Sequence, residues 1–157
     1  MLLEIGRDAV KTKWATCAAP IIRLPISTLG ETEAVLMEDW NIDDVIGFSF
    51  CVPAGTRTDG ASIPRFLWRI CGHPLMAPRV YAATLHDWLY GDYDLTAAAL
   101  HESRYFNTAL PTDLTRKEAD ECYRALLLHF GVAAWRADIE YYALRLFGAR
   151  HYKGKSK

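Results

Sequence analysis

The sequence predicts an α+β fold, with a small antiparallel sheet from the N-terminal third packed against three to four helices from the C-terminal two thirds. The first 57 residues consist of short apolar runs interrupted by proline and glycine, a pattern typical of strands and turns. From residue 62 onward, apolar residues recur at helical intervals, and capping residues mark where helices begin.

One domain accounts for nearly the whole chain. Its 157 residues, of which 51% are hydrophobic, are enough to bury one core. We predict a single α+β domain over residues 1–152. Residues 153–157 form a disordered tail, because they are basic and contain no apolar side chain.

Charge and hydropathy restrict the binding partners. The net charge of −1, from 18 basic and 19 acidic residues, creates no long-range attraction to nucleic acid or to an anionic membrane. We expect no nucleic-acid partner, and any binding has to be local. No stretch approaches the roughly 18 apolar residues of a transmembrane span, so we expect no such segment.

Three segments have the character of strands: residues 21–24, 33–37 and 45–52. The last ends before Pro53, which cannot donate a hydrogen bond to a sheet. The four cysteines, at positions 17, 51, 71 and 122, are widely spaced without a C-x-x-C pair, so we interpret them as buried thiols.

Helices are expected over residues 64–70, 78–90, 115–130 and 132–147. The first would have Ser62 as its N-cap, with Pro64 just inside. Thr115, followed by Glu118 three residues later, predicts a capping box at the start of the third helix.

His86 is the best candidate for a general base. Tyr90 follows four residues later and shares its helix face, whereas Asp87 points about a quarter-turn away. A histidine base needs a carboxylate to orient its second ring nitrogen. Asp120 is the best candidate, because its helix face is expected to pack inward.

Each of these residues also has a structural interpretation. Asp120 lies four residues after Arg116, so the two could form a surface ion pair. His86 could be a core histidine beside a surface aspartate, Asp87.

The segment Thr58-Asp59-Gly60-Ala61-Ser62 adds a third element, which we expect in the loop before the first helix. Asp59-Gly60 predicts a tight turn that exposes backbone amides and a carboxylate, although such a turn is also common in structural loops. We assign substrate binding to Thr58, Gly60 and Ser62, together with Tyr90.

Metal binding is predicted for Asp59 and Asp87. Their hard oxygen ligands suit a divalent cation, with calcium or magnesium favoured over zinc, because one histidine gives too few nitrogen ligands for zinc.

Several sequence blocks carry a family resemblance: residues 58–64 (TDGASIP), 85–90 (LHDWLY), 116–120 (RKEAD), 131–132 (GV) and 142–148 (YALRLFG). Together they resemble the phage and prophage family catalogued as domain of unknown function 1353, over roughly residues 45 to 148. The resemblance implies a bacteriophage or prophage origin. We expect synthesis in the host cytoplasm, because the short apolar run at residues 1–5 contains a charge and no cleavage site follows it; association with the virion is an alternative location.

A more local likeness is to the secreted and parvoviral phospholipases A. These enzymes use His-Asp-x-x-Tyr on one helix and an aspartate on a second, which His86, Asp87, Tyr90 and Asp120 resemble. By analogy His86 would activate water, Asp87 would bind calcium and Asp120 would orient His86. The glycine-rich calcium loop of those enzymes has no clear counterpart here.

Two functions follow from these residues. The first is a phage-encoded hydrolase that uses His86, Asp87 and Asp120 on a cell-envelope ester or amide. The second is a non-enzymatic phage protein, a tail or virion component that contacts other virion proteins or a protein that binds a host factor. Exposure separates them, because a catalytic His86 should line an open cleft, whereas a structural one should be enclosed and fully hydrogen-bonded.

Overall fold

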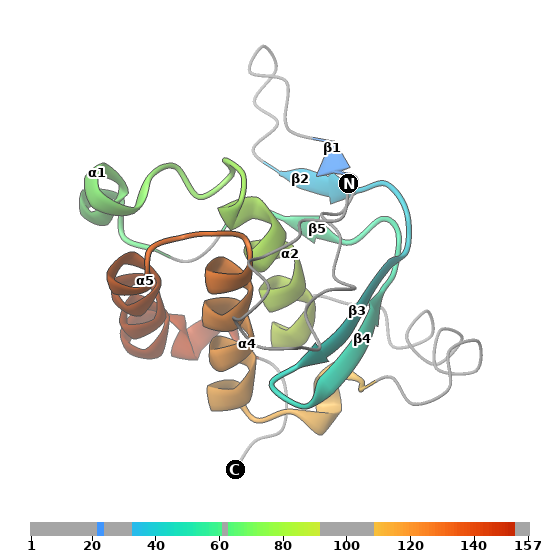
Figure 1. Ribbon diagram of the computed structural model, residues 1–157. Helices are drawn as coiled ribbons and strands as arrows, with labels where there is room; N and C mark the ends of the chain where they lie inside the picture. The colour runs from blue at the N-terminus through green and yellow to red at the C-terminus, as the bar shows by residue number, and fades with distance from the viewer. Residues whose placement is uncertain (1–21, 24–32, 61–62, 92–108, 153–157) are drawn as a thin grey trace, which may run out of the picture.

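The strand-rich part of the chain precedes the helical part, which confirms the α+β prediction. The computed structural model describes residues 22–23, 33–60, 63–91 and 109–152. Figure 1 shows the strands on one side of the molecule and the helices α1, α4 and α5 on the other, with α2 between them. The predicted tail, Cys17 and Ser62 lie outside the described residues.

The first sheet contains three short strands, β1 (Ile22–Arg23), β2 (Ala34–Leu36) and β5 (Arg57–Thr58). Both pairings are antiparallel and β2 is central, with Ala34 opposite Thr58. Thr58 therefore lies in a strand, and its predicted position in a loop was wrong. The backbone of β5 pairs with β2, which fixes the position of the Thr58 side chain.

The second sheet is a hairpin of β3 (Trp40–Val45) and β4 (Phe48–Val52). The prediction of one strand over residues 45–52 was wrong here, because the chain reverses at Ile46 and Gly47. Gly47 has a φ of +93°, which favours glycine, and its N–H donates to Oδ1 of Asp44 at 3.1 Å.

All four predicted helices are present, and the ends of the last three lie within two residues of the prediction. They are α1 (Trp68–Cys71), which follows the 3₁₀ turn η2 (Arg65–Leu67), then α2 (Arg79–Tyr90), α4 (Arg116–His129) and α5 (Ala134–Phe147). The first, predicted over residues 64–70, begins as a 3₁₀ turn, so its α-helical part starts four residues later than predicted. The described residues also form the 3₁₀ turns η3 (Pro111–Asp113) and η4 (Gly148–His151). The predicted cap of the first helix was wrong, because Pro64 occupies the N-cap position of η2 and forms no side-chain cap.

The capping box at the start of α4 is confirmed. The N–H of Thr115 donates to Oε2 of Glu118 at 2.6 Å, and the N–H of Glu118 donates to Oγ1 of Thr115 at 3.3 Å. These two bonds satisfy backbone donors that have no partner within the helix, and so fix where α4 begins.

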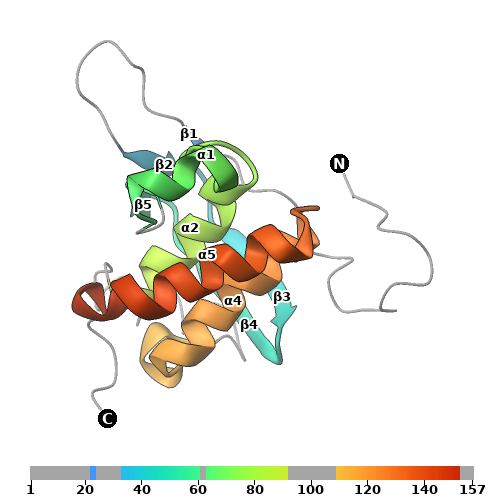
Figure 2. The same ribbon diagram turned by 90° about the vertical axis from the view of Figure 1, so that its left-hand side faces the viewer.

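Helix α2 forms the centre of the molecule. It packs against α4 on one side and β5 on the other, and α4 packs in turn against α5 (Figures 1 and 2). Only Tyr81 and Asp87 of α2 are not fully buried. The core joins both parts of the fold, as in the edge-to-face contact of Phe50 with Trp88, whose ring centroids lie 6.3 Å apart.

The expected burial of the cysteines is confirmed for Cys51, Cys71 and Cys122. Among the helices that the structure describes, none combines the length and the apolar character needed to cross a membrane.

Candidate functional site: a buried histidine and aspartate

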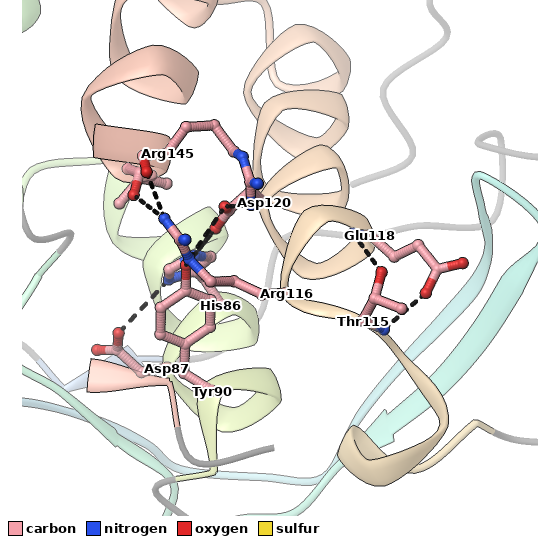
Figure 3. Close-up of polar contacts among 9 residues, drawn as sticks. His86, Asp87, Tyr90, Thr115, Arg116, Glu118, Asp120 and Arg145 are labelled. Atoms are coloured by element: carbon pink, nitrogen blue, oxygen red, sulfur yellow. Dashed lines mark hydrogen bonds and ion pairs between the residues drawn. The ribbon is translucent and has the colours of Figure 1, made fainter. Parts of the chain in front are cut away.

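The structure brings His86 and Asp120 together across the interface of α2 and α4. The imidazole Nε2 of His86 lies 2.8 Å from Oδ1 of Asp120 (Figure 3). His86 is 2% exposed and Asp120 is 0% exposed. The central position of α2 and the inward face of α4 thus create a buried histidine and carboxylate pair.

Asp120 is the acceptor on which several donors converge. Besides His86, the hydroxyl of Tyr90 donates to Oδ1 at 2.5 Å, and Nη1 of Arg145 on α5 donates to Oδ2 at 2.8 Å. Burial raises the pKa of Asp120, but the hydrogen bonds from these donors outweigh it, so the pKa lies below its ordinary value. Asp120 is therefore an ionised carboxylate.

Arg116 has a different main role from the predicted surface pair with Asp120. Its Nε lies 3.9 Å from Oδ2 of Asp120, at the long end of an ion pair. Its Nη2 donates to the backbone oxygens of Leu144 and Arg145, at 3.1 and 2.5 Å. These oxygens belong to the last turn of α5, so Arg116 fastens the start of α4 to the end of α5.

The second ring nitrogen of His86 is not hydrogen-bonded within the described part of the protein. Nδ1 lies 3.8 Å from Oδ1 of Asp87, longer than a hydrogen bond. Burial lowers the pKa of His86, but the hydrogen bond to Asp120 and the neighbouring Asp87 carboxylate raise it above its ordinary value.

Thr58 and Gly60 connect Asp87 to the first sheet. Oγ1 of Thr58 donates to Oδ2 of Asp87 at 2.5 Å, and accepts the N–H of Gly60 at 3.0 Å. Gly60 has a φ of +97°, and a Cβ there would lie 2.7 Å from Cβ of Pro74, so the position requires glycine. Burial raises the pKa of Asp87 above its ordinary value.

The described side chains do not by themselves form a metal centre. They contain no group of three or more histidine, cysteine, aspartate or glutamate residues placed to hold an ion. One oxygen of Asp87 accepts the Thr58 hydroxyl, and Asp59 is exposed to solvent. The assignment of Asp59 and Asp87 as metal ligands remains a prediction.

Arg145 has a role that the sequence analysis missed. Arg145 lies 25 positions after Asp120 and on a different helix, so no spacing pattern within one helix could connect the two residues. A second buried network was missed for the same reason. There Glu140, which is 0% exposed, accepts Nε of Arg79 and the hydroxyl of Tyr123, both at 2.7 Å.

Comparison with known proteins places this site in a family. Residues 34–144 match the model of the family described as "Protein of unknown function (DUF1353)". An uncharacterized protein of Sinorhizobium fredii (strain NBRC 101917 / NGR234), y4jT, is 30% identical over 113 residues, which is 72% of this chain and 28% of y4jT. The chain thus corresponds to less than a third of that relative's length. No solved structure matches the chain. Since the family match covers more than half of the chain, the protein belongs to the DUF1353 family.

Proposed function

We propose that this protein is a hydrolase in which His86 activates a water molecule and Asp120 positions His86. One observation carries the proposal: Asp120 occupies Nε2 of the imidazole, while Nδ1 has no hydrogen-bond partner among the described residues. If Nε2 carries the proton that Asp120 accepts, neutral His86 has its lone pair on Nδ1. That nitrogen is then the proton acceptor.

The proposed reaction is hydrolysis of an ester or amide of the cell envelope. Nδ1 of His86 takes a proton from water while the water oxygen attacks the carbonyl carbon. The tetrahedral intermediate then collapses, the bond to the leaving group breaks, and the imidazolium returns the proton to that group. Asp120 stays ionised throughout and stabilises the imidazolium through Nε2, which makes it a positioning residue.

Tyr90 supports the same role for Asp120. Its hydroxyl donates to the carboxylate oxygen that also faces His86, and its ring centroid lies 4.0 Å from that of His86. Asp120 and Tyr90 therefore restrict the imidazole from two sides, as a general base requires. The His-Asp-x-x-Tyr arrangement and the aspartate on a second helix support the comparison with phospholipases A.

A structural role for the same residues is the second candidate, and the enclosure of His86 favours it. At 2% exposure, His86 lacks the open access expected of a catalytic histidine. Its raised pKa also favours the charged form, which cannot accept a proton. In this case the network fastens α2, α4 and α5, and the protein acts by binding, as a virion component or as a ligand of a host factor.

Hydrolysis assays on matched variants test the two candidates. Wild type, His86→Gln and Asp120→Asn are incubated with phosphatidylglycerol vesicles and with peptidoglycan fragments, from pH 6 to pH 9. We expect wild type to cleave one substrate class, with a rate that rises as His86 loses its proton. His86→Gln should lose at least about 100-fold in rate.

His151→Gln serves as the control, because His151 is exposed in η4. It should retain the wild-type rate. Absence of cleavage by wild type on both substrate classes, or full activity of His86→Gln, would contradict the hydrolase and leave the binding function.

A further inference from the structure

The outward face of helix α5 is apolar. Trp135, Tyr142 and Leu146 are 54%, 63% and 74% exposed, and Ile139 is partly exposed. These four residues, the outer stripe of α5, follow one another at intervals of four, three and four, so they lie on one side of the helix. The opposite side packs against the protein through its buried residues, Ala137, Glu140, Ala143 and Leu144.

Helix α5 therefore has a buried side and an apolar outward side, and only the buried side is covered within the described part of the protein. A surface helix usually places polar residues opposite its buried face. Single exposed apolar residues are ordinary, whereas a continuous exposed stripe marks an interaction surface.

The neighbouring segment η2 and α1 extends this surface. Phe66 and Ile70 are 70% and 43% exposed and lie four residues apart. Helix α1 contacts α5, and both helices lie on the side of the molecule that faces the viewer in Figure 2. The exposed apolar side chains thus come from two adjoining elements.

Four exposed arginines lie on the same elements as this surface or on η4, which follows α5. Arg65 and Arg69 are exposed on η2 and α1, and Arg136 and Arg150 are exposed on α5 and η4. The described parts of these elements contain two acidic residues, and neither offers a free charge.

The first, Asp138, pairs with Nε of Arg124 at 2.6 Å, and the second, Glu140, is buried against Arg79. The exposed charge around the stripe is therefore positive, although the whole chain has a net charge of −1.

We propose that the outer stripe of α5, together with Phe66 and Ile70, docks on an anionic lipid membrane. Tryptophan and tyrosine favour the interface between lipid and water, because each side chain has an apolar ring and a polar group at its edge. The guanidinium of Arg136 lies 5.0 Å from the ring centroid of Trp135, so its charge is held beside the ring at headgroup depth.

Charge distinguishes this occupant from a second copy of the chain. In a twofold dimer through α5, the exposed arginines of one copy would approach those of the other copy, and the like charges would repel. An anionic lipid surface instead complements these positive charges, and each arginine close to the lipid adds to the affinity. Because the rest of the protein cancels this charge, the attraction acts over a short range.

Vesicle co-sedimentation tests the proposal. Wild type should bind vesicles of phosphatidylglycerol and phosphatidylcholine more strongly than vesicles of phosphatidylcholine alone. The double variant Trp135→Ser, Leu146→Ser should lose at least about tenfold in affinity, because both side chains would enter the lipid. Arg136→Ala should lose about fivefold.

A matched control uses exposed apolar residues on the strand side of the molecule (Figure 1). Met37 follows β2, Ile46 lies in the turn between β3 and β4, and they are 50% and 42% exposed. The double variant Met37→Ser, Ile46→Ser therefore removes exposed apolar side chains away from α5 and should bind as wild type does. All these variants should melt within about 3 °C of wild type, because surface substitutions change stability little.

Three results would overturn the proposal: no binding of wild type to anionic vesicles, equal binding by the α5 double variant, or a dimer in sedimentation velocity that this variant disrupts without any vesicle binding. The last would assign the surface to a second copy. Docking needs no turnover, so His86→Gln should bind vesicles as wild type does, and failure of the hydrolase proposal would leave this one unchanged.

Discussion

Arg145 reaches Asp120 from a neighbouring helix, with 2.8 Å between Nη1 and Oδ2. The same carboxylate holds His86 of α2, so one buried aspartate joins α2, α4 and α5. Disturbing this network should be costly. Removal of Asp120 leaves buried donors without their acceptor, and removal of a donor leaves the buried carboxylate with fewer partners.

Asp120→Asn should lower the free energy of unfolding by about 3 kcal/mol, because it removes the charge that His86 and Arg145 share in a buried site. Urea denaturation at pH 7 measures the loss. Asp138→Asn is the control, since Asp138 forms a partly exposed pair with Arg124 and should cost less than about 1 kcal/mol. Equal losses in the two variants would show that the burial of Asp120 confers no special stability.

The stability of the protein should fall as pH rises from 6 to 8. The pKa of His86 is raised in the folded state, so its contribution is complete below the unfolded pKa of about 6.5 and is lost as pH rises through the folded pKa. The pKa values of Asp87 and Glu140 are also raised, so their contributions fall with rising pH too, beginning at the lower unfolded pKa of a carboxyl.

Urea denaturation of wild type and His86→Gln at several pH values isolates the histidine. The difference between the two free energies of unfolding should shrink as pH increases. The comparison stops at pH 8, because burial raises the pKa of thiols such as Cys51, to about 11, and they contribute a similar loss at higher pH. Parallel curves for the two proteins would mean that His86 does not titrate differently on folding.

Arg116→Ala should lower the free energy of unfolding by about 2 kcal/mol, because it removes the donors to two backbone oxygens at the end of α5. Lys117→Ala is matched to it on the same helix turn. The ammonium of Lys117 pairs with Glu121 at 3.7 Å and its side chain is 67% exposed, so the loss should be under about 0.5 kcal/mol. Hydrogen exchange of the last turn of α5 should increase in Arg116→Ala alone; a protected turn would argue against this fastening.

Gly60→Ala should destabilise the protein more than Gly55→Ala. Both glycines have a positive φ, +97° and +86°, so both substitutions carry backbone strain of about 1 kcal/mol. Only the Cβ at residue 60 meets Pro74, at 2.7 Å, whereas nothing lies within 4 Å of the Cβ at residue 55. Thermal melting should therefore separate the two variants, and equal melting temperatures would show that Pro74 moves aside at little cost.

Local sequence patterns predicted the helices well, because a helix is determined largely by nearby residues. Thr115 and Glu118 marked the start of α4 through hydrogen bonds within one turn. The second sheet was harder. Trp40 and Ile42 are buried and alternate with the exposed Asn41, so the strand period of two was present in the sequence. Strand β3 was missed because a single strand was predicted over residues 45–52, which follow it.

The candidate site divides in the same way. His86, Tyr90 and Asp120 could be selected from helix spacing and from the known needs of a histidine base. The contacts of Arg145 could not, because they depend on how two helices cross. The exposure of His86 could not be predicted from the sequence. In the structure His86 is enclosed, as expected of a structural histidine, yet one of its ring nitrogens has no hydrogen bond within the described residues, which is not expected of one.

The segment that matches the DUF1353 family ends at Leu144, one residue before the arginine that reaches Asp120. Beyond it, a Cβ at Gly148 would lie 3.0 Å from the Tyr90 hydroxyl, and the Tyr152 hydroxyl donates to the backbone oxygen of Leu114 at 2.9 Å. A fragment cut at the family boundary would therefore lack Arg145, the counter-charge of Asp120, and the aromatic ring of Tyr152. The smallest piece that could be grafted into another protein with this site intact extends through Tyr152.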